Sequence, residues 1–128
     1  MKVTKLASKG FSLVEMLVVI AIIGVIAAIA VPQISDFTDS ANTNKTKRNA
    51  QNLSSVCSAA QAAGHDFVVT GDKAATITAI VTGATVASGS FAGEFFGVPN
   101  MDGTEQTAAA AYLSLTNGVL SYVPAGGQ

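Results

Sequence analysis

The chain has few of the residues that build catalytic or disulfide-stabilised sites. It contains one cysteine, Cys57, and one histidine, His65, and it has no tryptophan. A single cysteine excludes an intrachain disulfide. The sequence also has no paired carboxylates in a defined frame, no zinc ligand set, no nucleophile beside a base and no acidic run with calcium-loop spacing. We therefore expect a protein that is not an enzyme, with no catalytic residues, no metal and no cofactor.

Charge is also scarce. Charged residues form 12% of the chain, against about 25% in ordinary soluble domains. Three of the seven basic residues, Lys2, Lys5 and Lys9, lie within the first ten positions, and the rest of the chain has four basic and eight acidic residues. The resulting net charge of −4, with His65 neutral, argues against bulk electrostatic binding of nucleic acid.

Polar residues are nearly absent from residues 11–31, where only Ser12 and Glu15 interrupt an apolar run that stops before Pro32. These 21 residues, at about 1.5 Å each, make a helix of roughly 31 Å, which matches the hydrocarbon core of a bilayer. The pattern predicts a transmembrane helix over 11–31. An ionised carboxylate at the centre of a span costs about 2.5–3.5 kcal/mol on insertion scales, so Glu15 indicates a role beyond anchoring.

The segment before the span is polar and basic. In an ordinary secretory signal the apolar region precedes the cleavage site, whereas here it follows the Gly10-Phe11 junction. A cut at that junction removes residues 1–10 and leaves the apolar helix in the product. The leader lysines place the N-terminus in the cytoplasm and the C-terminal domain outside. The alternative is an uncleaved anchor that only tethers a domain, but a tether has no need of Glu15.

The basic leader, the sequence Gly-Phe-Ser-Leu-Val-Glu at residues 10–15 and the unbroken apolar helix together resemble the N-terminus of type IV pilins and type II secretion pseudopilins. The resemblance covers Met1 to about Gln33. It implies that a prepilin peptidase cuts between Gly10 and Phe11 and methylates the new amine of Phe11. It further implies that Glu15 pairs with the Phe11 amine of a neighbouring subunit.

The same resemblance implies helix loosening at Gly24 and Pro32 when the chain enters a filament. It places the protein in the bacterial inner membrane as a single-pass chain that lipid surrounds before assembly. The implied partners are prepilin peptidase, copies of itself and other pilins or pseudopilins, and an inner-membrane assembly platform with its ATPase. The assembled filament would then lie in the periplasm or at the cell surface.

Residues 32–64 are expected to continue the helix, because no glycine or proline follows Pro32 until Gly64, which we expect to cap the C-terminus. One face of the last three turns is apolar at helical spacing, at Leu53, Val56, Cys57 and Ala60. This pattern predicts a buried face and a structural Cys57. Between residues 42 and 52 only Ala50 is apolar, so we expect no domain to pack there.

Charges on this helix suggest a contact between subunits. Asp36 and Lys45 are nine residues apart, as are Asp39 and Arg48. Nine residues at about 100° make two and a half turns, so each base lies opposite its acid and about 13 Å along the helix. In an open assembly, Asp36 and Asp39 of one subunit would meet Lys45 and Arg48 of the next. There are two alternatives. These charges are solvated at the membrane edge, or Lys45, Lys47 and Arg48 contact DNA phosphates.

Residues 65–128 are expected to form the small globular pilin-like domain that the resemblance implies. Asp72 predicts the N-cap of a helix over 74–81 that ends at Gly83, although alternating β-branched residues make a strand over 76–81 an alternative. The capping-box spacing of residues 102–105 predicts one or two helical turns over 108–111. The Gly- and Ser-rich stretch 83–99 predicts a loop, with room for one short strand. Its expected anchors are Phe91, Phe95 and Phe96.

Residues 112–123 predict a β-hairpin. Asn117-Gly118 favours a type I′ turn, which pairs Leu115 with Leu120 and Leu113 with Tyr122 on one face. We expect that face to cover the apolar face of the long helix. The predicted fold class is therefore α+β: a long N-terminal helix, in which a membrane span continues into a soluble spine, with a small C-terminal antiparallel sheet packed on its C-terminal half.

Together these features predict a structural subunit of a type IV pilus-like filament or type II secretion pseudopilus, processed by prepilin peptidase and polymerised through its N-terminal helix. Many pilins close a C-terminal loop with a disulfide, which a lone Cys57 cannot form, so a secretion pseudopilin is slightly favoured. The alternatives are a DNA-uptake or minor pilin, although nucleic acid is not an expected partner, and a singly anchored partner-binding domain that does not polymerise.

Overall fold

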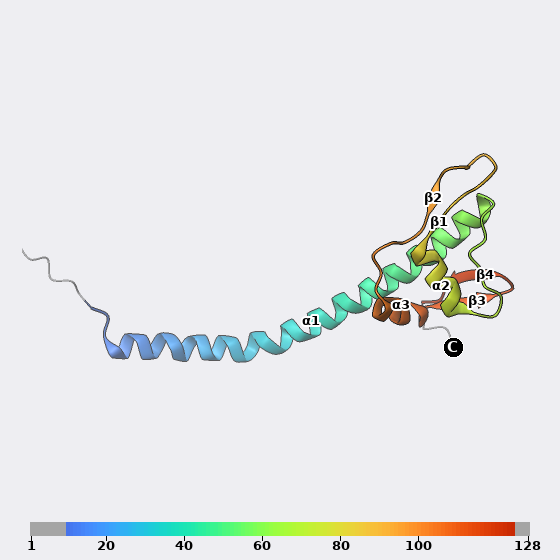
Figure 1. The fold of residues 1–128 in the computed structure, drawn as a ribbon. Helices are drawn as coiled ribbons and strands as arrows, with labels where there is room; N and C mark the ends of the chain where they lie inside the picture. The colour runs from blue at the N-terminus through green and yellow to red at the C-terminus, as the bar shows by residue number, and fades with distance from the viewer. Residues whose placement is uncertain (1–9, 125–128) are drawn as a thin grey trace, which may run out of the picture. The chain divides into compact units, whose positions relative to one another are not determined.

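The computed structural model describes residues 10–124. In chain order its elements are α1 (Leu13–Ala62), α2 (Lys73–Thr82), β1 (Ala84–Thr85), β2 (Phe95–Phe96), α3 (Gly103–Ala110), β3 (Leu113–Thr116) and β4 (Val119–Tyr122) (Figure 1). The strands form two antiparallel pairs, β1 with β2 and β3 with β4. The α+β class is confirmed, with two small sheets instead of one. The predicted leader, apart from Gly10, lies outside the described residues.

The chain divides into two compact units, Met1–Ser40 and Ala41–Gln128. In the first unit, α1 runs from Leu13 through Gly24 and Pro32 without interruption. None of the side chains in its apolar 18-residue window is buried. By length and composition this helix can cross a membrane. Because a helix that is apolar on all sides is stable only where water is excluded, this segment needs lipid or other helices around it.

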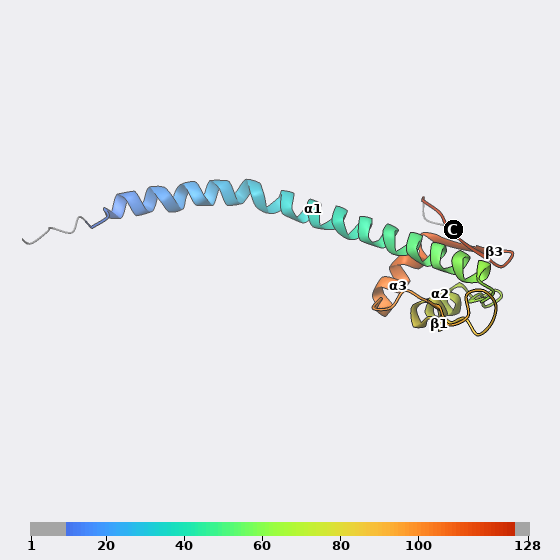
Figure 2. The same cartoon turned by 90° about the horizontal axis from the view of Figure 1, so that it is seen from above.

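In the second unit, the C-terminal turns of α1 form one wall of a hydrophobic core. The predicted apolar face is buried there, with Val56 partly buried beside Leu53, Cys57 and Ala60. The core also contains Ile77 and Ile80 from α2, Ala109 from α3, Leu113 from β3 and Leu120 from β4. Figure 2 shows α2 and α3 on one side of these turns of α1. A sheet and two short helices therefore pack on the end of one long helix.

The end of α1 is a Schellman motif. Gly64 has φ +93°, and its N–H donates to the carbonyl of Gln61 at 3.0 Å, while the N–H of His65 donates to the carbonyl of Ala60 at 2.9 Å. These are the two bonds that satisfy the last carbonyls of a helix when a glycine follows it in the left-handed conformation. The predicted cap at Gly64 is confirmed.

Residues 76–81, in which β-branched residues alternate, belong to the helix α2. The strand predicted as an alternative for this segment is wrong. The Asp72 carboxylate accepts a hydrogen bond from the N–H of Ala75 at 2.8 Å and caps the first turn. Gly83 follows the last turn with φ +74°. Since Ile77 and Ile80 are both buried, the three-residue spacing that places them on one helix face decides the conformation.

The β3–β4 hairpin has the predicted register. Leu115 pairs with Leu120 and Leu113 with Tyr122, and Asn117 and Gly118 both have positive φ, at 52° and 77°. Positive φ at both central residues defines the type I′ turn that the Asn-Gly sequence favours. Two side chains of α1 hold the hairpin: Ser54 Oγ donates to the carbonyl of Leu120, and Gln61 Nε2 to that of Gly118, each at 3.0 Å.

The prediction for residues 83–99 was partly wrong. Two short strands form instead of a loop with one, and Phe91 and Phe95 are 51% and 55% exposed instead of anchoring the segment. The ring of Phe95 lies against the backbone of Gly83, where a Cβ would come within 2.2 Å of Phe95 Cζ. Phe96 is partly buried against the core. The ring of Phe95 therefore rests on glycine backbone at the edge of the domain.

The expectation that no domain packs on residues 42–52 was wrong. Ala50 is fully buried. Lys45 forms an ion pair with Glu105 of α3, and the ammonium of Lys47 lies 5.9 Å from the centre of the Tyr112 ring. The prediction counted apolar residues only, whereas this contact uses one small apolar residue, two charges and the apolar stems that lysine side chains carry.

Candidate functional site

The first turn of α1 is closed by the one carboxylate of the apolar segment. The N–H of Ser12 donates to Glu15 Oε2 at 2.8 Å, and the carbonyl of Ser12 accepts from the N–H of Met16 at 3.2 Å. The Glu15 carboxylate thereby satisfies a backbone donor beside the positive end of the helix dipole. The sequence reasoning missed this role of Ser12, although the Ser-x-x-Glu spacing was a signal for it.

The surface around Glu15 is apolar and shallow. A groove of about 390 Å³ is lined by Phe11, Val14, Glu15, Met16, Val18 and Val19. A second groove, of about 350 Å³, follows on the same helix and is lined by Leu17, Val18, Ala21, Ile22, Val25 and Ile26. Glu15 is the only ionisable residue in either groove. Chemically, such a surface suits an apolar partner that presents a single cation.

The two residues predicted to loosen the helix have no packing role in this chain. A Cβ placed on Gly24 would meet no atom within 4 Å. Pro32 lies inside α1, where its missing N–H leaves the carbonyl of Ala28 without the usual helical donor. Gly24 has open space around it and Pro32 is exposed, so neither packs closely within the described chain, and their predicted role in the filament stays a prediction.

The predicted assembly charges fall in both units. Asp36 and Asp39 belong to the first unit, and Lys45 and Arg48 to the second. Lys45 pairs with Glu105, and the hydrogen bond and charge of Glu105 raise the pKa of Lys45. A neighbour's Asp36 would therefore compete with a partner that Lys45 already has within its own chain.

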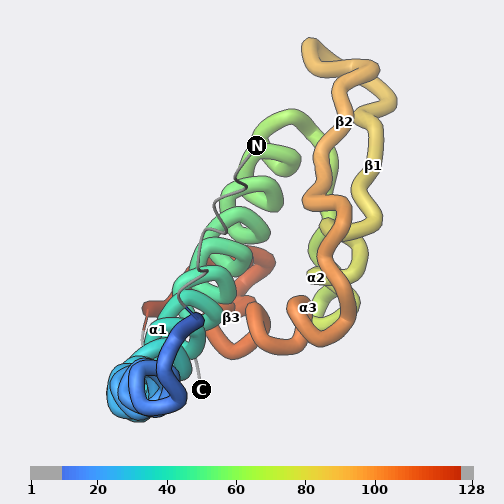
Figure 3. The backbone as a smooth tube through the Cα atoms, turned by 90° about the vertical axis from the view of Figure 1, so that its left-hand side faces the viewer, coloured from blue at the N-terminus to red at the C-terminus, as the bar shows by residue number. Residues whose placement is uncertain are grey.

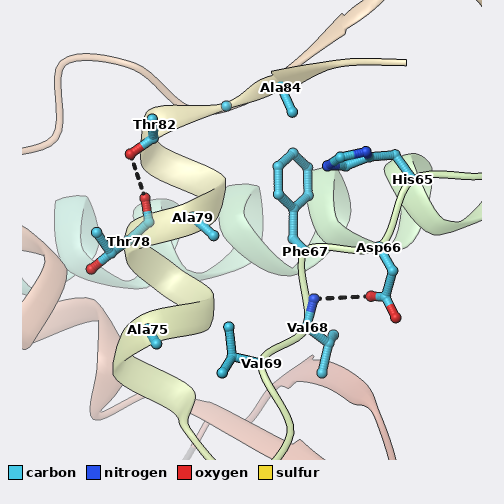
Figure 4. Close-up of a pocket in the computed structure, with 11 residues that line it drawn as sticks. His65, Asp66, Phe67, Val68, Val69, Ala75, Thr78, Ala79, Thr82 and Ala84 are labelled. Carbon is cyan, nitrogen blue, oxygen red and sulfur yellow. Dashed lines mark hydrogen bonds between the residues drawn. The ribbon is translucent and has the colours of Figure 1, made fainter. Parts of the chain in front are cut away.

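A groove of the second unit lies between α2 and the segment that follows α1 (Figure 4). Its volume is about 630 Å³, and its lining includes His65, Phe67, Val69, Ala79 and Thr82. The rings of His65 and Phe67 meet edge to face, with centroids 4.6 Å apart and planes at 72°. Figure 4 shows these rings facing the side chains of α2. The lining is mainly apolar, and it offers no nucleophile paired with a base.

The carboxylate of this groove, Asp66, has structural partners. Asp66 Oδ1 accepts from the N–H of Val68 at 2.9 Å and from Gln61 Nε2 at 3.1 Å, and these bonds lower the pKa of the carboxyl. Burial, and then the charge of Asp66, raise the pKa of the Cys57 thiol, which disfavours a reactive thiolate. Within residues 10–124, no three His, Cys, Asp or Glu side chains gather to hold a metal ion.

Lys73 is a structural residue that the sequence reasoning missed. Its ammonium donates to the carbonyls of Ala110 and Leu113, each at 2.9 Å. The side chain thus joins the start of α2 to the end of α3 and the start of β3. No local pattern announced this contact, because its acceptors lie 37 and 40 residues further along the chain.

Comparison with known proteins identifies the N-terminal segment. Residues 5–31 match the family model described as the prokaryotic N-terminal methylation motif. The chain therefore carries the prepilin-type signal of type IV pilin-like and pseudopilin precursors, which prepilin peptidase processes. The motif implies assembly with other pilins and is consistent with a single-pass anchor in the inner membrane. No curated protein and no solved structure matches the chain.

Proposed function

We propose that this protein is a structural subunit that polymerises through its N-terminal helix into a type IV pilus-like filament or a type II secretion pseudopilus. One observation carries the proposal: a helix whose apolar side chains are exposed all round has a single carboxylate in its first turn. A soluble monomer does not leave so large an apolar surface uncovered. Lipid covers this surface before assembly, and the helices of neighbouring subunits cover it afterwards.

Processing supplies the charge that assembly needs. In the precursor the nitrogen of Phe11 is part of an uncharged peptide bond. Cleavage after Gly10 makes it an amine, and α-amino groups are ordinarily protonated at neutral pH. The Glu15 carboxylate of one subunit then pairs with the methylated amine of Phe11 on the next, in an apolar layer where such a pair is strong. An inner-membrane platform and its ATPase extract the subunits.

The contacts of the basic residues support a structural role over DNA uptake. Lys45 is paired with Glu105, and Lys47 lies beside Tyr112. Of Lys45, Lys47 and Arg48, Arg48 is then the base that is left to bind a partner outside the chain. A single cation makes a weak electrostatic site for nucleic acid. The protein acts by assembling and not by catalysis, and the lone cysteine slightly favours a secretion pseudopilin over a surface pilin.

Mass spectrometry and cross-linking of native membranes test the proposal. The assembled protein should lack residues 1–10 and carry one methyl group on Phe11, and cross-linking should give a ladder of multimers. A Gly10→Leu variant is the matched control. It places a bulky side chain beside the cleavage site, and nothing lies within 4 Å of a Cβ at Gly10. This variant should keep its leader and lose the ladder. An intact leader with a single band in the wild type would instead show a tethered monomer.

A further inference from the structure

The connection between β1 and β2 carries an exposed phenylalanine and an exposed glutamate on one turn. Residues 91–94 form a β-turn closed by the N–H of Glu94, which donates to the carbonyl of Phe91 at 3.1 Å. The ends of such a turn lie within about 7 Å of each other. Gly93 has φ +92° at the third position, which glycine adopts without strain. The exposed side chains of Phe91 and Glu94 are therefore neighbours on one turn.

The hairpin holds this turn in a defined conformation. The N–H of Val86 donates to the carbonyl of Glu94 at 3.0 Å, and the N–H of Gly93 donates to the carbonyl of Val86 at 2.9 Å. Val86 itself is buried. The turn is thus hydrogen-bonded to a buried residue, Val86. The exposed residues Phe91 and Glu94 therefore lose little backbone freedom when they bind.

A groove lined mainly by asparagine and basic residues lies on α1. It has a volume of about 440 Å³ and is lined by Ala41, Asn44, Lys45, Arg48, Asn49 and Asn52. Arg48 is exposed, and in the described part of the chain the one ion pair is that of Lys45 with Glu105. The buried residues Ala50 and Leu53 follow Arg48 by about 200° and 500° of helix rotation. Arg48 therefore faces away from the core of its own domain.

The turn and the groove complement each other and lie on different sides of the second unit. Figure 3 shows the β1–β2 hairpin standing apart from α1. A carboxylate matches a guanidinium, and an exposed aromatic ring packs on the guanidinium face. Two complementary surfaces on different sides of one domain allow a heterologous contact, in which every subunit uses both surfaces and the assembly stays open.

We propose that the Phe91–Glu94 turn of one subunit docks into the Arg48 groove of a neighbouring copy. The Glu94 carboxylate pairs with the guanidinium of Arg48, and the Phe91 ring lies against it. This inference rests on the proposed function, because it supplies a contact between domains to an assembly held together by the N-terminal helix. It gives Arg48 a different partner from Asp39, which sequence spacing alone had suggested.

Charge exchange tests the pairing in the full-length protein in membranes. Glu94→Arg and Arg48→Glu should each lower the yield of cross-linked multimers by on the order of fivefold, the factor that about 1 kcal/mol represents. The double variant should recover most of the yield. A double variant no better than either single variant would overturn the proposal. The proposal would also be overturned if the Asp39→Arg, Arg48→Asp double variant recovered the multimer yield and the Glu94→Arg, Arg48→Glu double variant did not.

Disulfide trapping tests the same contact without relying on charge. Cys57 is buried, so it can stay in place. Glu94→Cys combined with Arg48→Cys should give an oxidised ladder. Glu94→Cys with Ala59→Cys is the matched control, because Ala59 is exposed on the same face of α1 about 16 Å further along. Equal ladders from the two pairs, or a ladder from the Ala59 pair alone, would contradict the docking.

These experiments separate the docking from the proposed function. If the wild type gives no multimers, both fail together. If the wild type and the Glu94→Arg variant give equal ladders, the docking contact is wrong and polymerisation through the N-terminal helix stands. Protease resistance of the domain in each variant shows that a lost ladder does not reflect a lost fold.

Discussion

The two units use the same kind of residue in opposite ways. Leu13 in the first unit is 80% exposed, whereas Leu53, on the same helix in the second unit, is fully buried. Both belong to α1, so helix formation does not separate them. The difference is that residues 65–124 supply side chains that cover Leu53, while the described chain supplies none for Leu13. The apolar surface of the first unit therefore needs partners from outside the chain.

Carboxylates show the same contrast. Glu105 in the second unit pairs with Lys45 of its own chain. Among the described residues, Glu15 in the first unit is held by the backbone N–H of Ser12, in a groove otherwise lined by apolar side chains. A carboxylate placed among apolar side chains needs a cation once water is excluded. Under the proposed function, this cation comes from a neighbouring subunit.

The largest expected effect follows from removing this carboxylate. Glu15→Ala should abolish the multimer ladder while leaving leader cleavage and the protease resistance of the second unit unchanged. Glu15→Gln is the control for the helix cap, because its amide oxygen still accepts from the N–H of Ser12. Both variants should fail to assemble. Full assembly by the glutamine variant would show that Glu15 acts as a cap and not as a charge.

Matched leucine truncations compare the units directly. Leu113→Ala removes a fully buried side chain and should lower the free energy of unfolding by about 2–5 kcal/mol. Leu17→Ala removes an exposed side chain of the first unit and should leave the stability of the second unit unchanged. The measurement is the protease-resistant fraction of detergent-solubilised protein across a urea series. A loss of similar size from Leu17→Ala would show that the units do not differ as described.

A smaller effect is expected at the hairpin turn. Gly118→Val puts a β-branched residue where φ is +77°, which costs more than about 1 kcal/mol. Cleavage after Gly64 should become faster in limited proteolysis. Gly118→Asn is the control, since asparagine tolerates the left-handed conformation. Unchanged protease resistance in the valine variant would contradict the turn.

The smallest effect concerns the ion pair of the second unit. The hydrogen bond and charge of Glu105 raise the pKa of Lys45 above its usual 10.5. Because the folded pKa lies above the unfolded one, the stabilisation is fully present below about 10.5 and is lost as the pH rises through the folded pKa. Lys45→Gln should therefore lower the thermal midpoint slightly at neutral pH and make no difference at strongly alkaline pH. If the thermal midpoints of the wild type and the variant still differ at strongly alkaline pH, the Lys45–Glu105 pair is not the cause of the difference.

Much of the second unit could be predicted where the pattern was local. Asp72 caps the start of α2, Gly83 caps its end, and Gly64 ends α1. Each of these residues satisfies backbone groups within a few residues of itself. The helix cap formed by Ser12 and Glu15 was just as local, and the sequence reasoning overlooked it. The exposure of Phe91 and Phe95 could not be inferred, since an exposed phenylalanine and a buried one look alike in a sequence.

The apolar helix, the prepilin-type signal and the register of the β3–β4 hairpin could all be inferred from the amino-acid sequence. These depend on the spacing of neighbouring residues and on the φ values that Asn117 and Gly118 allow. The contact of Lys45 with Glu105, sixty residues away, and the link that Lys73 makes from α2 to α3 could be seen only in the folded chain. A charged side chain on a helix can reach many partners, and the packing of distant segments selects one of them.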